Sequence, residues 1–306
     1  MAIPHPIQRR KLPVNCRGRH ILPPVFVYAT LATMRKGKGW RTEQREGLRY
    51  YCLIDPEGGP GDGILVQGIF TRRGGVSRGP WKGPNVGHAA GDEWRAVEAN
   101  RIRICRALNI PRQALTTAQQ VHGVHIAHVR PEGLGRTFPA TDGLVTNVPG
   151  IALMLHFADC VPLLFFDPRH LAVGLAHAGW RGTLAGIANR MAEAMDSAFG
   201  SRPEDLMAGI GPAIGPCCYE VGHGLARRVQ AQFPQWPDLI HWQKGAPYFD
   251  LWLANRRQLE AAGVRSIAMA ECCTACHVEE FYSYRAEGGQ TGRFAAVIGL
   301  RKATWK

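Results

Sequence analysis

Three long apolar runs follow one another between residues 151 and 177. They cover residues 151–157, 161–166 and 171–177, and none alternates regularly between apolar and polar side chains. A strand with one face in water shows such alternation, whereas a strand covered on both faces reads as a nearly continuous apolar run. The chain must therefore build a sheet covered on both faces. We predict an α/β fold: a single compact, layered domain with a mixed sheet and helices packed on the sheets.

The rest of the chain supplies short elements separated by turns. It holds 36 glycines and 21 prolines, which argues against a long helical bundle. Helical spacing of apolar residues predicts helices over residues 92–108, 184–199, 225–233 and 251–262. Short apolar stretches predict further strands over residues 64–70, 118–121, 124–129, 207–210, 266–270 and 295–300.

Positive charge is concentrated near the N-terminus. The chain has a net charge of +13, and residues 1–45 hold ten basic residues and one acidic residue. We therefore predict a basic N-terminal extension over residues 1–63, at most partly ordered, and a folded domain over residues 64–306. Nucleic-acid binding would need a basic face on the folded body, and its sequence shows none, so we predict no nucleic-acid partner.

The cysteines and the lengths of the apolar runs bear on the compartment. Nine cysteines cannot all pair with one another, and their clustering is unlike that of a small disulfide scaffold, so a reducing compartment is favoured. No run approaches the ~20 apolar residues of a membrane helix. Pro23 and Pro24 interrupt the one stretch that imitates a signal peptide. We expect a cytoplasmic protein without a membrane partner, and the sequence leaves its oligomeric state open.

Polar side chains stand at the ends of the apolar runs. His122 lies in a Gln-Val-His-Gly segment, Cys160 in Ala-Asp-Cys, and His177 in His-Ala-Gly-Trp-Arg-Gly. Two imidazoles and one thiolate, with a fourth position left open, are typical of a catalytic zinc site. The same residues also suit a metal-free cysteine nucleophile, with Cys160 beside His177. A third alternative is a buried cysteine with two histidines bonded to backbone, and spacing alone does not separate the three.

The residue identities of the motifs indicate more about the protein than their spacing does. The segments that carry a resemblance begin at Thr71-Arg72-Arg73-Gly74-Gly75 and include the three above. They continue through Gly211-Pro212-Ala213-Ile214-Gly215-Pro216-Cys217-Cys218-Tyr219-Glu220, Asp250-Leu251-Trp252, Cys273-Thr274-Ala275-Cys276 and Phe281-Tyr282-Ser283-Tyr284-Arg285. In this order they resemble the laccase-domain family, also described as the multicopper polyphenol oxidase or purine nucleoside phosphorylase family. The resemblance covers about residues 64–301.

The resemblance implies a zinc ion held by His122, Cys160 and His177, with copper as the alternative metal. It implies phosphorolysis of purine nucleosides (adenosine, inosine, guanosine and methylthioadenosine), with adenosine deamination as a side activity. The partners would then be purine nucleosides and phosphate. A role in peptidoglycan quality control is attached to some members of the family.

Further site residues follow from position and chemistry. Together with the three metal ligands, Arg72 completes the catalytic set that we predict, because a guanidinium binds phosphate bidentately. Asn85 would bind the sugar or the base, or hold its own turn. Arg181 would bind an anion, and Asp159 would orient His177 or cap a turn.

Other functions stay open beside the phosphorylase. They are a metal-free Cys-His hydrolase of cell-wall precursors, a copper phenol oxidase, and a non-enzymatic interaction factor. A structural zinc site at Cys272, Cys273, Cys276 and His277 is disfavoured, because the sequence offers only one Cys-x-x-Cys pair.

Overall fold

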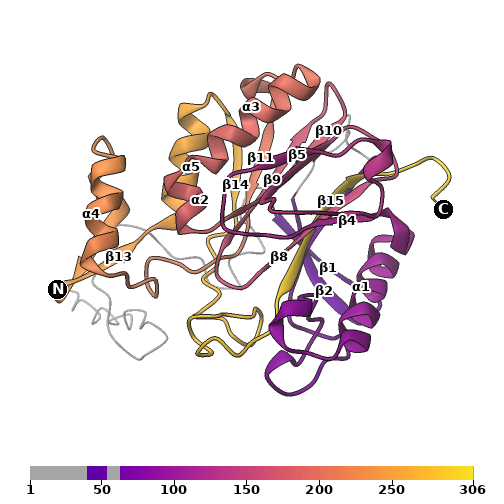
Figure 1. Ribbon diagram of the computed structural model, residues 1–306, viewed down its shortest axis with the longest axis horizontal. Helices are drawn as coiled ribbons and strands as arrows, with labels where there is room; N and C mark the ends of the chain where they lie inside the picture. Colours follow the sequence, from indigo (N-terminus) through magenta and orange to yellow (C-terminus); the bar gives the residue numbers. More distant parts are fainter. Residues whose placement is uncertain (1–39, 54–62, 306) are drawn as a thin grey trace, which may run out of the picture.

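Two β-sheets packed face to face form the centre of the molecule (Figure 1). The computed structural model describes residues 40–53 and 63–305. Its seven-stranded sheet has, in spatial order, β1 (Trp40–Arg45), β2 (Leu48–Leu53), β3 (Leu65–Phe70), β15 (Phe294–Leu300), β8 (Ala152–Phe157), β4 (Leu115–Ala118) and β6 (Thr137–Phe138). The six-stranded sheet has β14 (Ser266–Met269), β11 (Met207–Ile210), β9 (Val161–Asp167), β10 (Ala172–Ala178), β7 (Gly143–Thr146) and β5 (Ile126–His128). Both sheets contain parallel and antiparallel pairs.

The remaining elements within the described residues are five α-helices, six short 3-10 helices and a hairpin. The α-helices are α1 (Trp94–Leu108), α2 (Trp180–Leu184), α3 (Ile187–Phe199), α4 (His223–Gln232) and α5 (Leu251–Ala261). The hairpin pairs β12 (Ile240–Gln243) with β13 (Ala246–Phe249). None of these helices is long and apolar enough to cross a bilayer.

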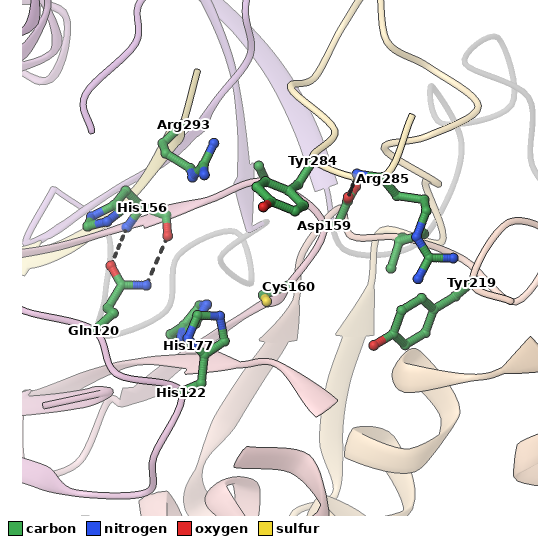
Figure 2. A pocket seen from close by; sticks show the side chains of 12 residues that line it. Gln120, His122, His156, Asp159, Cys160, His177, Tyr219, Tyr284, Arg285 and Arg293 are labelled. Atoms are coloured by element: carbon green, nitrogen blue, oxygen red, sulfur yellow. Dashed lines mark hydrogen bonds between the residues drawn. The ribbon is translucent and has the colours of Figure 1, made fainter. Parts of the chain in front are cut away.

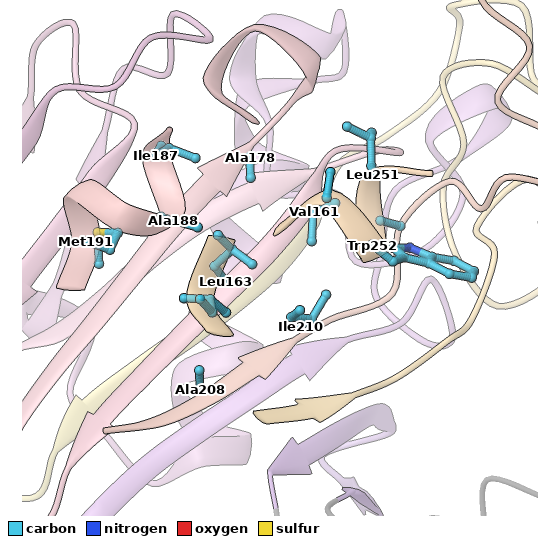
Figure 3. Close-up of a cluster of buried hydrophobic side chains, with 14 of the residues drawn as sticks. Val161, Leu163, Ala178, Ile187, Ala188, Met191, Ala208, Ile210, Leu251 and Trp252 are labelled. Carbon is cyan, nitrogen blue, oxygen red and sulfur yellow. The ribbon is translucent and has the colours of Figure 1, made fainter. Parts of the chain in front are cut away.

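Strand β9 shows why the long apolar runs occur. Leu164 and Phe166 point into the core shared with the seven-stranded sheet, where Leu155 of β8 also lies. Leu163 and Phe165, on the opposite face, pack in the core beneath α3 and α5 (Figure 3). Both faces of the strand are therefore dry, which confirms the prediction of a covered sheet.

The outer face of the seven-stranded sheet is covered by α1. Val97 and Ile104 of this helix are fully buried, and Ile104 packs in one cluster with Phe70 of β3 and Leu115 of β4. The order of layers is therefore α1, seven-stranded sheet, six-stranded sheet, and α2 with α3 and α5 (Figure 1). This layered α/β architecture is the one predicted.

Part of the N-terminal segment belongs to the folded body. Strands β1 and β2 pair with each other, and β2 pairs with β3. Trp40 is 7% exposed, and Tyr50 and Tyr51 are 3% exposed. Residues 40–53 are thus strands of the seven-stranded sheet and not an appendage, because their aromatic side chains are part of the core. The rest of the predicted extension, residues 1–39 and 54–62, lies outside the described residues.

Several predicted boundaries were wrong. The helix predicted over residues 184–199 begins three residues later, as α3, because Gly186 adopts a positive φ of 80° and separates it from α2, which ends at Leu184. The strand predicted over residues 118–121 lies three residues earlier, as β4, where the β-branched Thr116 and Thr117 pair with β8. Strand β7 and the β12–β13 hairpin were not predicted, because β7 has only two apolar side chains and β12 mixes His241 and Gln243 with its apolar residues.

Candidate metal centre

Antiparallel pairing brings the site together at one edge of the six-stranded sheet. His177, near the end of β10, faces Pro162 near the start of β9. Cys160 directly precedes β9, so it lies beside His177 although 17 residues separate them. Asp142 directly precedes β7, and its carbonyl accepts a 2.8 Å hydrogen bond from the His177 backbone N–H. Strand ends that are distant in sequence therefore converge on one point.

The three predicted metal ligands are neighbours. One donor atom each from His122, Cys160 and His177 lies within 4.8 Å of the other two. The imidazole rings of His122 and His177 meet edge to face with centroids 4.8 Å apart. His177 is only 4% exposed, whereas Cys160 is half-buried and His122 is exposed. Figure 2 shows the three side chains next to one another in the pocket, and their arrangement suits a metal with one open position.

Asp142 orients two of these ligands. Its Oδ1 lies 2.8 Å from Nδ1 of His177, and a carboxylate can only accept, so Nδ1 carries the proton and Nε2 is left as the ligand atom. The same carboxylate accepts hydrogen bonds from the backbone N–H groups of Val121, His122 and Gly123 at 2.7–3.1 Å. These bonds hold His122 at a positive φ of 61°, a strained conformation for a residue with a side chain.

In the metal-free chain, the opposite charges of Cys160 and His177 stabilise each other. Burial by itself would raise the pKa of the Cys160 thiol, but the charge of His177 and contacts with both histidines outweigh it and lower the pKa to about 6. Burial would lower the pKa of His177, but the Cys160 thiolate and Asp142 raise it to about 9. Near neutral pH the pair is therefore a thiolate beside an imidazolium, and the thiolate is the form that binds metals.

Asp159 does not orient His177, contrary to one of our predictions. Its Oδ1 accepts a 2.6 Å hydrogen bond from the Thr274 hydroxyl, and its Oδ2 accepts one of 2.7 Å from the backbone N–H of Arg285. Its backbone has a positive φ of 85°. Asp159 therefore ties the turn before Cys160 to two loops from the C-terminal third of the chain.

A cavity of about 470 Å³ opens over the three ligands. Arg285 lies with its guanidinium carbon 5.1 Å from the ring centre of Tyr219, and Arg293 lies 5.4 Å from that of Tyr284. The cavity is lined by Gln120, His122, His156, Ala158, Asp159, Cys160, His177, Ile214, Tyr219, Tyr284, Arg285 and Arg293 (Figure 2). Burial lowers the pKa of His156 to about 3, so this ring is neutral. The two guanidinium groups are therefore the fixed positive charges of the cavity.

Three predicted site residues lie outside this lining. Arg72 donates to Oε1 of Glu287 at 2.9 Å and to a backbone carbonyl at 2.7 Å. Asn85 is fully buried; its oxygen accepts from two backbone N–H groups, one of them that of Arg293, and its amide donates to Asp92. Arg181 is exposed and lies over the ring of Trp180, 4.3 Å from its centre, beside a different hollow. The structure thus brings together the metal ligands but not these three side chains.

Sequence reasoning missed Asp142, Arg285 and Arg293. Arg285 ends the closing motif Phe281–Arg285 and Arg293 lies in the glycine-rich stretch that follows it, so a signal was present but pointed to no particular role. Asp142 lies in a Thr-Asp-Gly turn before a four-residue strand, and only the pairing of β7 with β10 reveals its target.

Known proteins share both sequence and fold with this chain. Residues 66–301 match the family described as multi-copper polyphenol oxidoreductase laccase. Purine nucleoside phosphorylase YlmD of Geobacillus stearothermophilus is 40% identical over 275 residues, covering 86% of this chain and 97% of the relative. The purine nucleoside phosphorylase of Deinococcus radiodurans is 41% identical over 237 residues, covering 77% and 89%. The crystal structure of YlmD from Geobacillus stearothermophilus superimposes with a TM-score of 0.78 at 37% identity, covering 85% of this chain and 99% of that one.

Proposed function

Because the chain belongs to the multi-copper polyphenol oxidoreductase laccase family, we propose that it is a zinc-dependent purine nucleoside phosphorylase. Relatives named purine nucleoside phosphorylase align with about three quarters or more of the chain. The observation that carries the proposal is the open His122, Cys160 and His177 site at the floor of a cavity with two arginines. Deamination of adenosine is proposed as a side activity of the same site.

The donor set fits a single zinc ion. His122, Cys160 and His177 would hold it, with Asp142 fixing the proton on His177 so that Nε2 faces the metal. Two imidazoles and a thiolate also bind copper, but a single three-ligand group is too small for the several coppers of a multicopper oxidase. When bound, zinc supplies a Lewis acid and lowers the pKa of a coordinated water to about 7.

The cavity suits a nucleoside and an anion. Its volume of about 470 Å³ is within the range of about 300–1,000 Å³ that is typical of small-molecule sites. Tyr219 and Tyr284 offer ring faces for a purine base. Arg285 and Arg293 offer donor forks for phosphate, and we place phosphate on them because Arg72 is already paired with Glu287.

The residues of the cavity would then contribute to the reaction in two ways, by positioning the reactants and by supplying charge. The arginines would hold phosphate so that one of its oxygens attacks C1′ of the sugar as the bond to the base nitrogen breaks. The sugar passes through an oxocarbenium-like transition state, as in glycoside cleavage. The products are the free base, whose nitrogen takes up the proton that the attacking phosphate gives up, and pentose 1-phosphate. The neutral ring of His156 and the Gln120 side chain, which is bonded to the His156 backbone at 2.9 and 3.0 Å, form a rigid wall.

The test is release of hypoxanthine from inosine with and without phosphate, with ribose 1-phosphate measured as the second product. Arg293→Lys should slow base release by about one to two decades at limiting phosphate, since a lost charge-assisted bond costs about 1.5–3 kcal/mol. Arg72→Lys is the matched control outside the cavity and should leave the phosphate dependence unchanged. Equal base release in phosphate-free buffer would reject phosphorolysis. An effect confined to Arg72→Lys would return the phosphate site to that residue.

A metal-free cysteine hydrolase is the second candidate. The observation that favours it is the low pKa of Cys160, about 6, beside His177. After chelation, alkylation of Cys160 by iodoacetamide should have its midpoint near pH 6, below the about 8.5 of an ordinary thiol. Added zinc should block the reaction if the thiolate is a ligand. Alkylation at the same rate with saturating zinc would favour the free nucleophile.

A further inference from the structure

Four cysteines form a second cluster, apart from the candidate metal centre. Their sulfurs all lie within 4.8 Å of one another, and the four are Cys217, Cys218, Cys273 and Cys276. The sulfur of Cys276 lies 3.5 Å from that of Cys217 and 3.4 Å from that of Cys218. Cys272 and His277, which the sequence placed with the Cys-x-x-Cys pair, are not members. The adjacent pair Cys217–Cys218 takes the place of the missing second Cys-x-x-Cys.

The spacing fits one tetrahedral ion. Ligand sulfurs at about 2.3 Å from zinc are about 3.8 Å apart at the corners of a tetrahedron, close to the measured 3.4 and 3.5 Å. These separations are much longer than the about 2.05 Å of a disulfide bond. An iron–sulfur cluster, which places several atoms between its cysteines, needs a wider group than this one. Four thiolates around a single ion are typical of structural zinc.

The backbone holds the two cysteine loops against each other. Parallel strands β11 and β14 end at the same edge of the sheet, and the pairing continues beyond them as a bridge between Ala213 and Cys273. The backbone N–H of Gly215 donates to the Cys273 sulfur at 3.2 Å. A Cβ at Gly215 would lie 2.6 Å from the ring of Trp252. The loop therefore needs glycine there to approach both groups.

Electrostatics point the same way, since the four sulfurs all lie within 4.8 Å of one another. Four thiols at this distance cannot all lose their protons unless a cation lies between them. Binding a divalent metal would release those protons and bind the two loops to each other.

We propose that Cys217, Cys218, Cys273 and Cys276 bind a structural zinc ion, distinct from the open site at His122, Cys160 and His177. The four-thiolate site is closed, since its protein ligands fill every position of a tetrahedron. Its role is to fix the wall of the cavity.

The connection to the cavity runs through short contacts. The backbone N–H of Ile214 donates to the carbonyl of Asp159 at 2.9 Å, and that of Tyr219 donates to Gly215 at 2.9 Å. Ile214 and Tyr219 line the cavity. From the other loop, the Thr274 hydroxyl donates to Asp159. Zinc at the cluster would therefore hold both loops that fix the turn before Cys160.

The experiment measures zinc in the full chain, purified under reducing conditions without chelator. Cys276→Ser should contain one zinc per chain less than the wild type, whatever the occupancy of the open site. Cys272→Ala is the matched control, a buried neighbour outside the cluster, and should keep the wild-type count. Cys160→Ala should lose its zinc from the other site, so failure of the proposed function is distinguishable from failure of this proposal.

A second measurement does not depend on how the Cys276→Ser variant folds. X-ray absorption of zinc in Cys160→Ala, with the open site emptied, should show four sulfur neighbours at about 2.3 Å, and cobalt(II) exchange should give the intense visible bands of a four-thiolate tetrahedron. An unchanged zinc count in Cys276→Ser would overturn the proposal. Iron or copper at the cluster would also overturn it. A Cys217–Cys218 disulfide, detected by mass spectrometry in protein that never contained metal, would do the same.

Discussion

Replacing Asp142 with Asn is the most informative single perturbation of the candidate metal centre. The carboxylate is fully buried and accepts four hydrogen bonds, two at each oxygen. Oδ1 receives those of His177 Nδ1 and the His122 backbone, and Oδ2 receives those of the Val121 and Gly123 backbones. Asn has nearly the same shape but presents an NH₂ group where one of the two oxygens was.

Either orientation of the new amide has a definite cost. With NH₂ in place of Oδ2, two backbone donors lose their acceptor, and at about 1–3 kcal/mol each the loss is about 2–6 kcal/mol of unfolding free energy. With NH₂ in place of Oδ1, His177 must accept through Nδ1 and carry its proton on Nε2, the atom that would bind the metal. Loss of such a supporting carboxylate typically weakens metal binding by about 10–100-fold.

The assay is zinc affinity by chelator competition, combined with urea unfolding of metal-free protein. The matched control is Asp167→Asn at the other end of the sheet. Asp167 is also fully buried and accepts from the backbone of Arg169 and from the backbone and ring of His170. The control should lower unfolding free energy without changing zinc affinity. If Asp142→Asn bound zinc as tightly as the wild type and unfolded at the same urea concentration, the assigned role of Asp142 would be refuted.

Two further predictions concern the same centre. Burial opposes ionisation of Asp142, but its hydrogen bonds outweigh burial and hold the pKa below its usual value. The stabilisation by this carboxylate is therefore present above the unfolded pKa of about 3.9 and is lost as the pH falls through the folded value. Urea titrations should show a difference in unfolding free energy between wild type and Asp142→Asn that is constant from pH 6 to about 5 and shrinks below about pH 4. Gly179→Ala should weaken zinc binding, because the new Cβ would lie 3.0 Å from the Cys160 sulfur and 3.1 Å from the His122 ring, and it should cost little stability, because the φ of −77° suits any residue. The control is Gly224→Ala, which is in open space on α4. Equal zinc affinities for the two variants would contradict the prediction.

The main features of the fold were predictable because burial leaves a local mark on the sequence. The apolar runs of β8, β9 and β10 predicted strands covered on both faces. In the structure these strands lie between two packed layers. Helix α1 was predictable from apolar spacing, although of its expected apolar face Val97 and Cys105 are buried whereas Trp94 and Ile102 are exposed. Strands β1 and β2 were assigned to a basic extension because ten basic residues lie in residues 1–45 and the composition changes only near residue 64, yet Trp40 and Tyr50 are core residues. Their burial depends on β3, which the local sequence does not reveal.

The sequence by itself pointed to His122, Cys160 and His177 as candidate metal ligands, because a histidine or cysteine at the end of a buried strand stands out against its apolar neighbours and the family resemblance implies the same three residues. Only the tertiary structure decided what surrounds them. Asp142 reaches His177 because β7 pairs with β10, and Arg293 reaches the cavity although Arg72 does not. Cys217 and Cys276 meet across 59 residues because β11 and β14 are parallel. Spacing along a chain carries no information about such contacts, since strand order and register place them.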